Sequence, residues 1–108
     1  MLTLLAALIV LHGLIHLLGV AKAFGWADLP QLMRPITPLY GALWLAAAML
    51  FGVTATALFA WPRWSWELGL CAVMVSTIVI VPSWSDAKAG AIANAVVLLG
   101  LFLMSRGR

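Results

Sequence analysis

Residues 2–21 read LTLLAALIVLHGLIHLLGVA, twenty consecutive positions without a charged side chain. At about 1.5 Å per residue, a helix of this length crosses the roughly 30 Å hydrocarbon core of a bilayer. The strands of a membrane barrel would alternate polar and apolar residues, whereas this run is apolar on all sides. The run therefore predicts a transmembrane α-helix.

Three further apolar runs follow, at residues 38–60, 65–81 and 86–104. The whole chain is 66% hydrophobic and 8% charged, which leaves too little polar surface to cover a soluble globule of 108 residues. We therefore predict an all-α integral membrane protein, with residues 1–108 forming a single transmembrane four-helix bundle. No soluble domain is expected.

The connections between the runs carry helix start and stop signals. Thr37-Pro38 offers a hydroxyl N-cap followed by proline at the first helical position. Pro62-Arg63-Trp64-Ser65 and Pro82-Ser83-Trp84-Ser85 are each predicted to end one helix at proline and to begin the next at a serine cap. The longer first loop, residues 22–37, can lie along the membrane surface. Residues 28–34 could form a short interfacial helical turn there.

Most of the tryptophans and all of the charges lie near the ends of the runs. Five tryptophans flank the runs, which is typical of interfacial anchors, and only Trp44 lies well inside one. The net charge of +3 suits contact with anionic headgroups and does not indicate a nucleic acid partner. Cys71, the single cysteine, lies in an apolar run and is interpreted as a packing residue.

The orientation follows from the basic residues. An even number of spans places both termini on one side, together with Arg63, Arg106 and Arg108, whereas Lys22, Arg34 and Lys88 lie on the other side. The count is equal, but the free N-terminal amine adds positive charge to the first group. We therefore expect both termini in the cytoplasm.

Polar side chains inside the runs are the strongest functional signal, because ionisable groups are costly in a bilayer. His12 and His16 are the only such groups there, and their spacing of four residues puts them on one helix face. His16 precedes Lys22 by six residues, Ser76 precedes Pro82 by six, and Asn94 follows Lys88 by six. All three should lie roughly 9 Å below the same membrane surface.

This agreement predicts one shared polar layer, with Thr77 and Tyr40 at a similar depth. The candidate ligand-binding residues are His12, His16, Tyr40, Ser76, Thr77 and Asn94. The candidate surface ion pairs at the mouth of the layer involve Lys22, Asp28, Arg34, Asp86 and Lys88. A purely structural explanation remains open, in which the polar groups satisfy one another, for example His16 with Asn94, and lock the helices together.

Three functional hypotheses use this layer. In the first, the histidines bind a metal or haem across a subunit interface, although no membrane carboxylate or second cysteine completes a metal site within one chain. In the second, the chain is a dimeric small-molecule transporter that works through His12 or His16. In the third, a small subunit houses a lipid, quinone or similar apolar molecule. The third fits the distribution of polar residues best, and it requires no metal or cofactor.

Three stretches of the chain also resemble a known group. Residues 11–19 (LHGLIHLLG), 22–25 (KAFG) and 83–90 (SWSDAKAG) are similar to those of small bacterial membrane proteins that are loosely DoxX-like. The resemblance covers nearly the whole chain and implies four transmembrane helices in a bacterial inner membrane. Some DoxX-like relatives are associated with quinone-linked oxidoreductases, but no catalytic residue is implied. We therefore expect a non-enzymatic accessory or ligand-binding subunit, with a membrane protein partner or as a homo-oligomer.

Overall fold

The computed structural model describes residues 2–26 and 36–106 of the chain. Within this part, the fold has four long α-helices and no strand, namely α1 (Leu2–Ala23), α2 (Pro38–Ala60), α3 (Ser65–Ile80) and α4 (Trp84–Arg106). A short 3-10 turn, η1 (Pro62–Trp64), leads directly into α3. Counting η1 with α3, all four are long and apolar enough to cross a membrane. The predicted all-α architecture is confirmed, and the helix bounds lie within two residues of the predicted runs.

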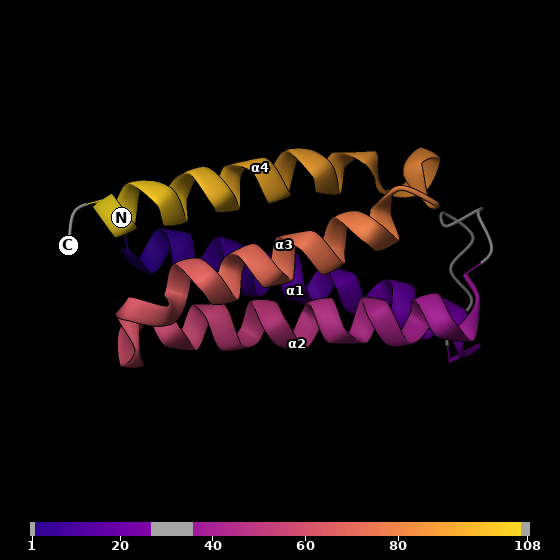
Figure 1. Ribbon diagram of the computed structural model, residues 1–108. Coiled ribbons are helices and arrows are strands. Elements are labelled where there is room, and N and C mark those ends of the chain that lie inside the picture. Colours follow the sequence, from indigo (N-terminus) through magenta and orange to yellow (C-terminus); the bar gives the residue numbers. More distant parts are fainter. Residues whose placement is uncertain (1, 27–35, 107–108) are drawn as a thin grey trace.

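The helices form an elongated bundle of 43 × 22 × 20 Å. Figure 1 shows the N- and C-termini at one end, and the connections from α1 to α2 and from α3 to α4 at the other end. Each helix packs closely on the next along the chain, whereas α1 and α4 touch only sparsely. The bundle is therefore less tightly closed along one line, which we call the α1–α4 seam.

The start of α2 follows the predicted cap. The Thr37 side chain accepts a hydrogen bond from the backbone N–H of Tyr40 at 3.3 Å, and Pro38 occupies the first helical position. The short interfacial turn predicted at residues 28–34 lies outside the described residues.

The serine caps predicted at Ser65 and Ser85 are wrong. Ser65 is already helical, and its hydroxyl donates to the carbonyl oxygen of Pro62 at 2.8 Å. Ser85 lies inside α4, which begins at Trp84. In both segments, helical structure begins before the predicted serine. A proline such as Pro62 has a fixed φ that suits the first position of a helical turn, so it can begin a helix as well as end one.

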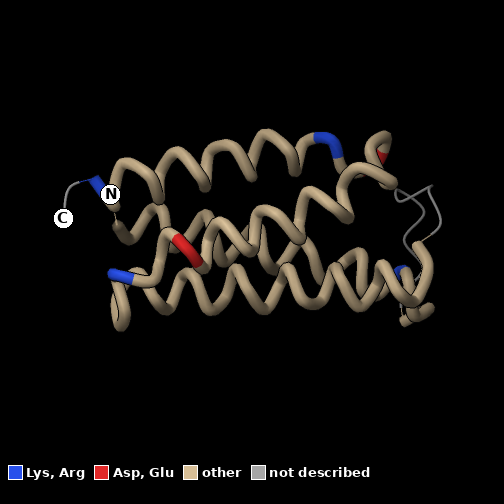
Figure 2. Tube along the Cα trace, in the orientation of Figure 1, with Lys and Arg blue, Asp and Glu red and all other residues tan. Residues whose placement is uncertain are grey.

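Large apolar side chains point outward from every helix. Leu4, Leu14, Phe59 and Ile92 are each more than half exposed, as are many others. Figure 2 shows the charged residues of the described part only toward the two ends of the bundle, with an uncharged zone between them. An apolar girdle between two charged ends matches the layers of a bilayer, and it indicates a membrane protein.

Two apolar clusters fill the interior. The terminal cluster, nearer the chain ends, consists of Leu5, Ala6, Ile9, Ala47, Phe51, Ala55, Leu58, Ala72, Val73, Val97 and Leu101. The loop cluster, nearer the α1–α2 connection, consists of Val20, Trp44, Val79 and Ile80. Along α1, His12 and His16 lie between the two clusters, so the polar layer separates the two parts of the core.

Two glycines of α1 set how closely α2 approaches the histidines. A Cβ atom on Gly13 would lie 3.0 Å from the Cβ of Phe51, and one on Gly19 would lie 2.5 Å from the Trp44 ring. Neither position has room for a side chain unless the aromatic residue moves. The glycines thus allow Phe51 and Trp44 to rest against α1 on either side of the polar layer.

Candidate functional site

The polar layer is a continuous hydrogen-bond network between α1, α3 and α4. His12 Nε2 and Asn94 Oδ1 are 2.7 Å apart, and His16 Nε2 and Ser76 Oγ are also 2.7 Å apart. Asn94 Nδ2 donates to Ser76 Oγ at 3.0 Å and to Thr77 Oγ1 at 3.3 Å. The network connects the first, third and fourth helices, and four of its five side chains are buried.

The partners fix where the histidine protons lie. His16 Nδ1 is 2.7 Å from the backbone carbonyl of His12, which can only accept, so this nitrogen carries the proton. The other nitrogen, Nε2, then accepts from the hydroxyl of Ser76. His12 faces the amide oxygen of Asn94, another pure acceptor, so its proton lies on Nε2. Each imidazole is thus held in one defined tautomer.

The orientation of the Asn94 amide follows from the same reasoning. Thr77 donates its hydroxyl proton to the carbonyl oxygen of Val73 at 2.8 Å, so it has only lone pairs to offer Asn94. The Asn94 NH₂ group therefore faces Thr77, and its oxygen faces His12. A second acceptor, Asn94 Oδ1, lies 3.2 Å from Ser76 Oγ, so the Ser76 proton has a choice of two partners.

Helix α2 contributes aromatic walls in place of polar groups. The Phe51 ring lies 4.9 Å from the ring of His12 and 5.2 Å from that of His16, measured between centroids. The Trp44 ring lies 5.0 Å from His16 on the other side, and the two imidazoles meet edge to face at 4.6 Å. On the side of α2, aromatic rings therefore cover the network and shield its hydrogen bonds from competing polar groups.

The pairing expected between His16 and Asn94 is wrong in detail. Asn94 bonds directly to His12, and it reaches His16 only through Ser76. The depth of Asn94 was counted from Lys88, but α4 begins four residues earlier, at Trp84. Asn94 therefore lies deeper than expected and level with the deeper histidine.

The other predicted residues divide into three groups. Tyr40 lies against the loop cluster, and its hydroxyl has no hydrogen bond within the described part of the chain, so Tyr40 does not join the network. Of the predicted ion-pair residues, Asp86 and Lys22 are half-buried and Lys88 is exposed. Asp28 and Arg34 lie outside the described residues.

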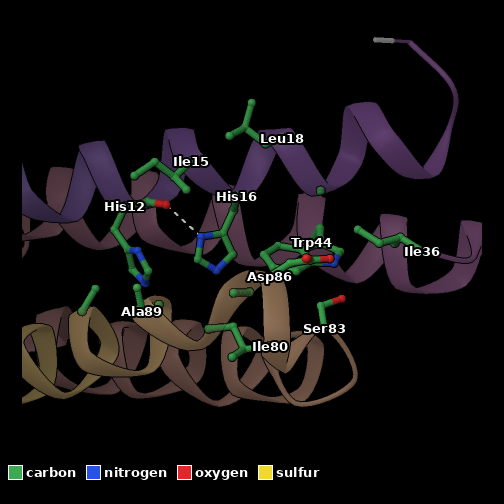
Figure 3. Close-up of a pocket in the computed structure, with 14 residues that line it drawn as sticks. His12, Ile15, His16, Leu18, Ile36, Trp44, Ile80, Ser83, Asp86 and Ala89 are labelled. Atoms are coloured by element: carbon green, nitrogen blue, oxygen red, sulfur yellow. Dashed lines mark hydrogen bonds between the residues drawn. The ribbon is translucent and has the colours of Figure 1, made fainter. Parts of the chain in front are cut away.

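A cavity of about 230 Å³ adjoins the network at the α1–α4 seam. Figure 3 shows His12 and His16 facing Ala89 and Ile80, with Trp44 beside them. The complete lining is His12, Ile15, His16, Leu18, Gly19, Ile36, Trp44, Ile80, Ser83, Asp86, Ala87, Ala89, Gly90 and Ala93. Ile15, Leu18 and Ala89 are also exposed on the outside of the bundle, so the cavity opens toward the surrounding lipid.

Among the cavity residues that sequence reasoning missed, Trp44 and Ser83 are the two with polar side-chain atoms. Both are buried and line it, yet tryptophans were interpreted chiefly as interfacial anchors and Ser83 as a turn residue. One signal was available, since Trp44 is the only tryptophan well inside an apolar run. The indole N–H of Trp44 is buried and has no hydrogen-bond partner among the described residues.

The donor set of the site offers little to a metal ion. Among the described residues, no group of three histidine, cysteine or acidic side chains could hold one. Both ring nitrogens of His16 already have partners, so ligation by His16 would break the bond to Ser76 or to the His12 carbonyl. His12 Nδ1 alone has no hydrogen bond within the part of the chain described here.

Comparison of the chain with models of protein families, with curated proteins and with solved structures finds no match. The site's geometry is thus the basis for the functional argument that follows.

Proposed function

We propose that the protein is a small non-enzymatic membrane subunit that binds one apolar, lipid-like or quinone-like molecule in the cavity at the α1–α4 seam. The cavity itself supports this proposal most directly. It lies within the membrane-spanning part of the bundle, its walls are mainly apolar or small side chains, and its mouth faces lipid. A ligand dissolved in the membrane can enter such a site without passing through water.

The size of the cavity suits part of a larger molecule. A cavity of roughly 150 Å³ can take up benzene, and pockets for drug-sized ligands begin near about 300 Å³. At about 230 Å³, this cavity would hold a substituted ring or a short length of acyl chain. The remainder of the ligand would extend through the mouth between Leu18 and Ala89 into the bilayer.

The hydrogen-bond network supports a scaffolding role. Most polar atoms of the network already form hydrogen bonds within it, as those of His16, Ser76 and Asn94 do, so few remain for acid–base chemistry. The same bonds hold α1, α3 and α4 at fixed spacing beside the cavity. In this proposal, the histidines keep the binding site open and do not carry a proton or an electron.

Replacing Ala89 with leucine tests the proposal, because Ala89 lines the cavity and its exposed position tolerates a larger side chain. Protein purified in mild detergent should retain a bound apolar molecule that mass spectrometry detects in an organic extract. We expect the Ala89→Leu variant to lose most of it. Ala95→Leu, an exposed change on α4 outside the cavity lining, should retain it.

Two results would contradict the proposal. The first is that the organic extract of the unchanged protein contains only bulk lipid, in the same amount as the extracts of the two leucine variants. The second is sustained, substrate-driven ion flux in liposomes that His16→Ala abolishes, which would instead establish the transporter hypothesis.

For location, we infer a bacterial inner membrane with both termini in the cytoplasm. Helical spans suit an inner membrane, and the chain ends lie together in Figure 1. The N-terminal amine and Arg106 add positive charge at that end. A green fluorescent protein fused to the C-terminus should fluoresce. If this fusion does not fluoresce and an alkaline phosphatase fused at the same site is active, the C-terminus lies outside the cytoplasm and the inferred orientation is wrong.

A further inference from the structure

Three buried side chains around the cavity each leave one polar atom unused. Trp44, Ser83 and His12 are 6%, 5% and 4% exposed, respectively. Among the described residues, the Trp44 indole N–H is a buried donor without a hydrogen-bond partner, and neither the Ser83 hydroxyl nor His12 Nδ1 makes a hydrogen bond there. Unsatisfied buried polar groups such as the Trp44 N–H are rare in folded proteins. Because Ser83 and His12 line the same cavity as this donor, we expect the occupant of the cavity to supply hydrogen-bond partners.

These atoms are not spread evenly around the cavity. Figure 3 shows Trp44 and Ser83 on the same side, whereas His12 lies at the other end, beyond His16. Ser83 belongs to the turn between α3 and α4, so this side is the one nearer the membrane surface. Deeper in the cavity, the walls include Ile15 and Ala93. Trp44 and Ser83 thus lie at the shallow end of the cavity, and apolar walls separate them from His12 at the deeper end.

The chemistry of the two shallow groups restricts the ligand. An indole N–H can only donate, and a serine hydroxyl can donate while keeping its lone pairs free. Two donors on one side suit an oxygen atom with two lone pairs. The Asp86 side chain also lines this side of the cavity, beside Trp44 (Figure 3). A carbonyl oxygen meets the requirement without bringing a negative charge close to that acidic side chain, where it would be costly.

We propose that the cavity binds an uncharged apolar molecule through a carbonyl oxygen that accepts hydrogen bonds from Trp44 Nε1 and Ser83 Oγ. This inference rests on the ligand-binding function proposed above and adds the chemical class of the ligand. A quinone ring and the ester group of a lipid both present such an oxygen. The apolar body of the ligand lies along Ile15 and Leu18, with its far end toward His12.

The sharpest test removes the indole N–H and keeps the shape of the ring. Benzothienylalanine, in which sulfur replaces the N–H of tryptophan, is introduced at residue 44. The matched control carries the same residue in place of Trp66, which packs beside Phe102 and does not line the cavity. A second pair is Ser83→Ala, with Ser85→Ala as an exposed control in the same turn.

Binding is measured by thermophoresis in a nonionic detergent with three uncharged probes, namely decyl-substituted benzoquinone, dioleoylglycerol and dodecylbenzene. The last probe is apolar but has no oxygen. We expect at least one oxygen-bearing probe to bind more tightly than dodecylbenzene. Loss of the Trp44 N–H should weaken that binding about tenfold, and Ser83→Ala should weaken it about threefold. The two control variants should bind like the unchanged protein.

The probes also separate the two sources of the carbonyl group. Binding of the quinone alone identifies a quinone-like ligand, and binding of dioleoylglycerol alone identifies a lipid ester. If the benzothienyl variant at residue 44 binds both oxygen-bearing probes as tightly as unchanged protein, the inference is overturned. It is also overturned if dodecylbenzene binds as well as they do.

Failure of this inference can be told apart from failure of the proposed function. If the probes bind, Ala89→Leu blocks them and the change at Trp44 has no effect, the cavity binds a ligand but not through this donor. If no probe binds the unchanged protein and no molecule copurifies with it, both proposals are wrong.

Discussion

The two halves of the bundle are held together by different means. Near the termini, apolar side chains from all four helices interlock, and Ile9, Phe51 and Leu101 are completely buried there. Near the loops, a network of directed hydrogen bonds replaces much of that packing and a cavity opens beside it. The terminal half is filled by packed apolar side chains, whereas the loop half contains a cavity whose lining includes polar atoms without hydrogen-bond partners among the described residues. The ligand site that we propose lies in the loop half.

The difference also has an energetic side. In lipid, helices gain little from the hydrophobic effect, so packing and hydrogen bonds hold them together. Interhelical hydrogen bonds in bilayers contribute only about 0.6 kcal/mol each on average. We therefore expect the terminal half to supply most of the stability and the loop half to supply specificity.

The largest expected effect comes from opening the terminal half. Leu101 is fully buried and packs against Gly69, so Leu101→Ala leaves a cavity where four helices meet. We expect the free energy of unfolding to fall by about 2 kcal/mol, the low end for buried leucines, because lipid removes the water-transfer part of the cost. Equilibrium unfolding in mixed detergent micelles measures it.

The matched control is Leu103→Ala, two residues further along α4, where the side chain is 58% exposed. This change should alter stability by less than about 0.5 kcal/mol. Both variants should still retain the copurifying ligand. Equal losses from the two changes would show that the terminal half is not the main source of stability.

A smaller effect is expected from the network of the loop half. A double-mutant cycle with His12→Ala and Asn94→Ala should give a coupling energy of about 0.6 kcal/mol, because the two side chains bond directly. A cycle between His16 and Asn94 should give less, because Ser76 stands between them. A stronger coupling for the second pair would overturn the arrangement described here.

The smallest effect is expected at Tyr40. Its hydroxyl makes no hydrogen bond within the described residues, and its ring packs on the loop cluster. Tyr40→Phe should therefore change the free energy of unfolding by less than about 0.5 kcal/mol and leave probe binding unchanged. A clear loss of binding would return Tyr40 to the ligand site, where the sequence had placed it.

The sequence was sufficient for the helices and for most members of the polar layer, although Asn94 lies deeper than predicted. A run of apolar residues long enough to cross a bilayer can satisfy its backbone hydrogen bonds there only as a helix or in a closed barrel. The predicted helix bounds therefore lie within two residues of the observed ones. Counting from the ends of the runs also brought together Ser76, Asn94 and His16, which lie on three different helices. Helix rise is constant, so depth can be counted from the sequence.

Partners within the layer were harder to predict. Which atom meets which depends on helix rotation and on where α4 begins. The depth of Asn94 was counted from Lys88, four residues inside α4, so the predicted partner was His16 and the observed partner is His12. The cavity was not predictable either. It arises because α1 and α4 pack sparsely, and no local pattern in either helix specifies that spacing.

The bond between His12 and Asn94 joins residues that are 82 positions apart in the chain. At a synthesis rate of about 5–20 residues per second, His12 must wait roughly 4–16 s for Asn94 to be made. His16 acquires Ser76 earlier, because α3 is completed before α4. During biosynthesis, His12 is therefore made before Asn94, and the hydrogen bond that joins α1 to α4 can form only after the last helix has been made.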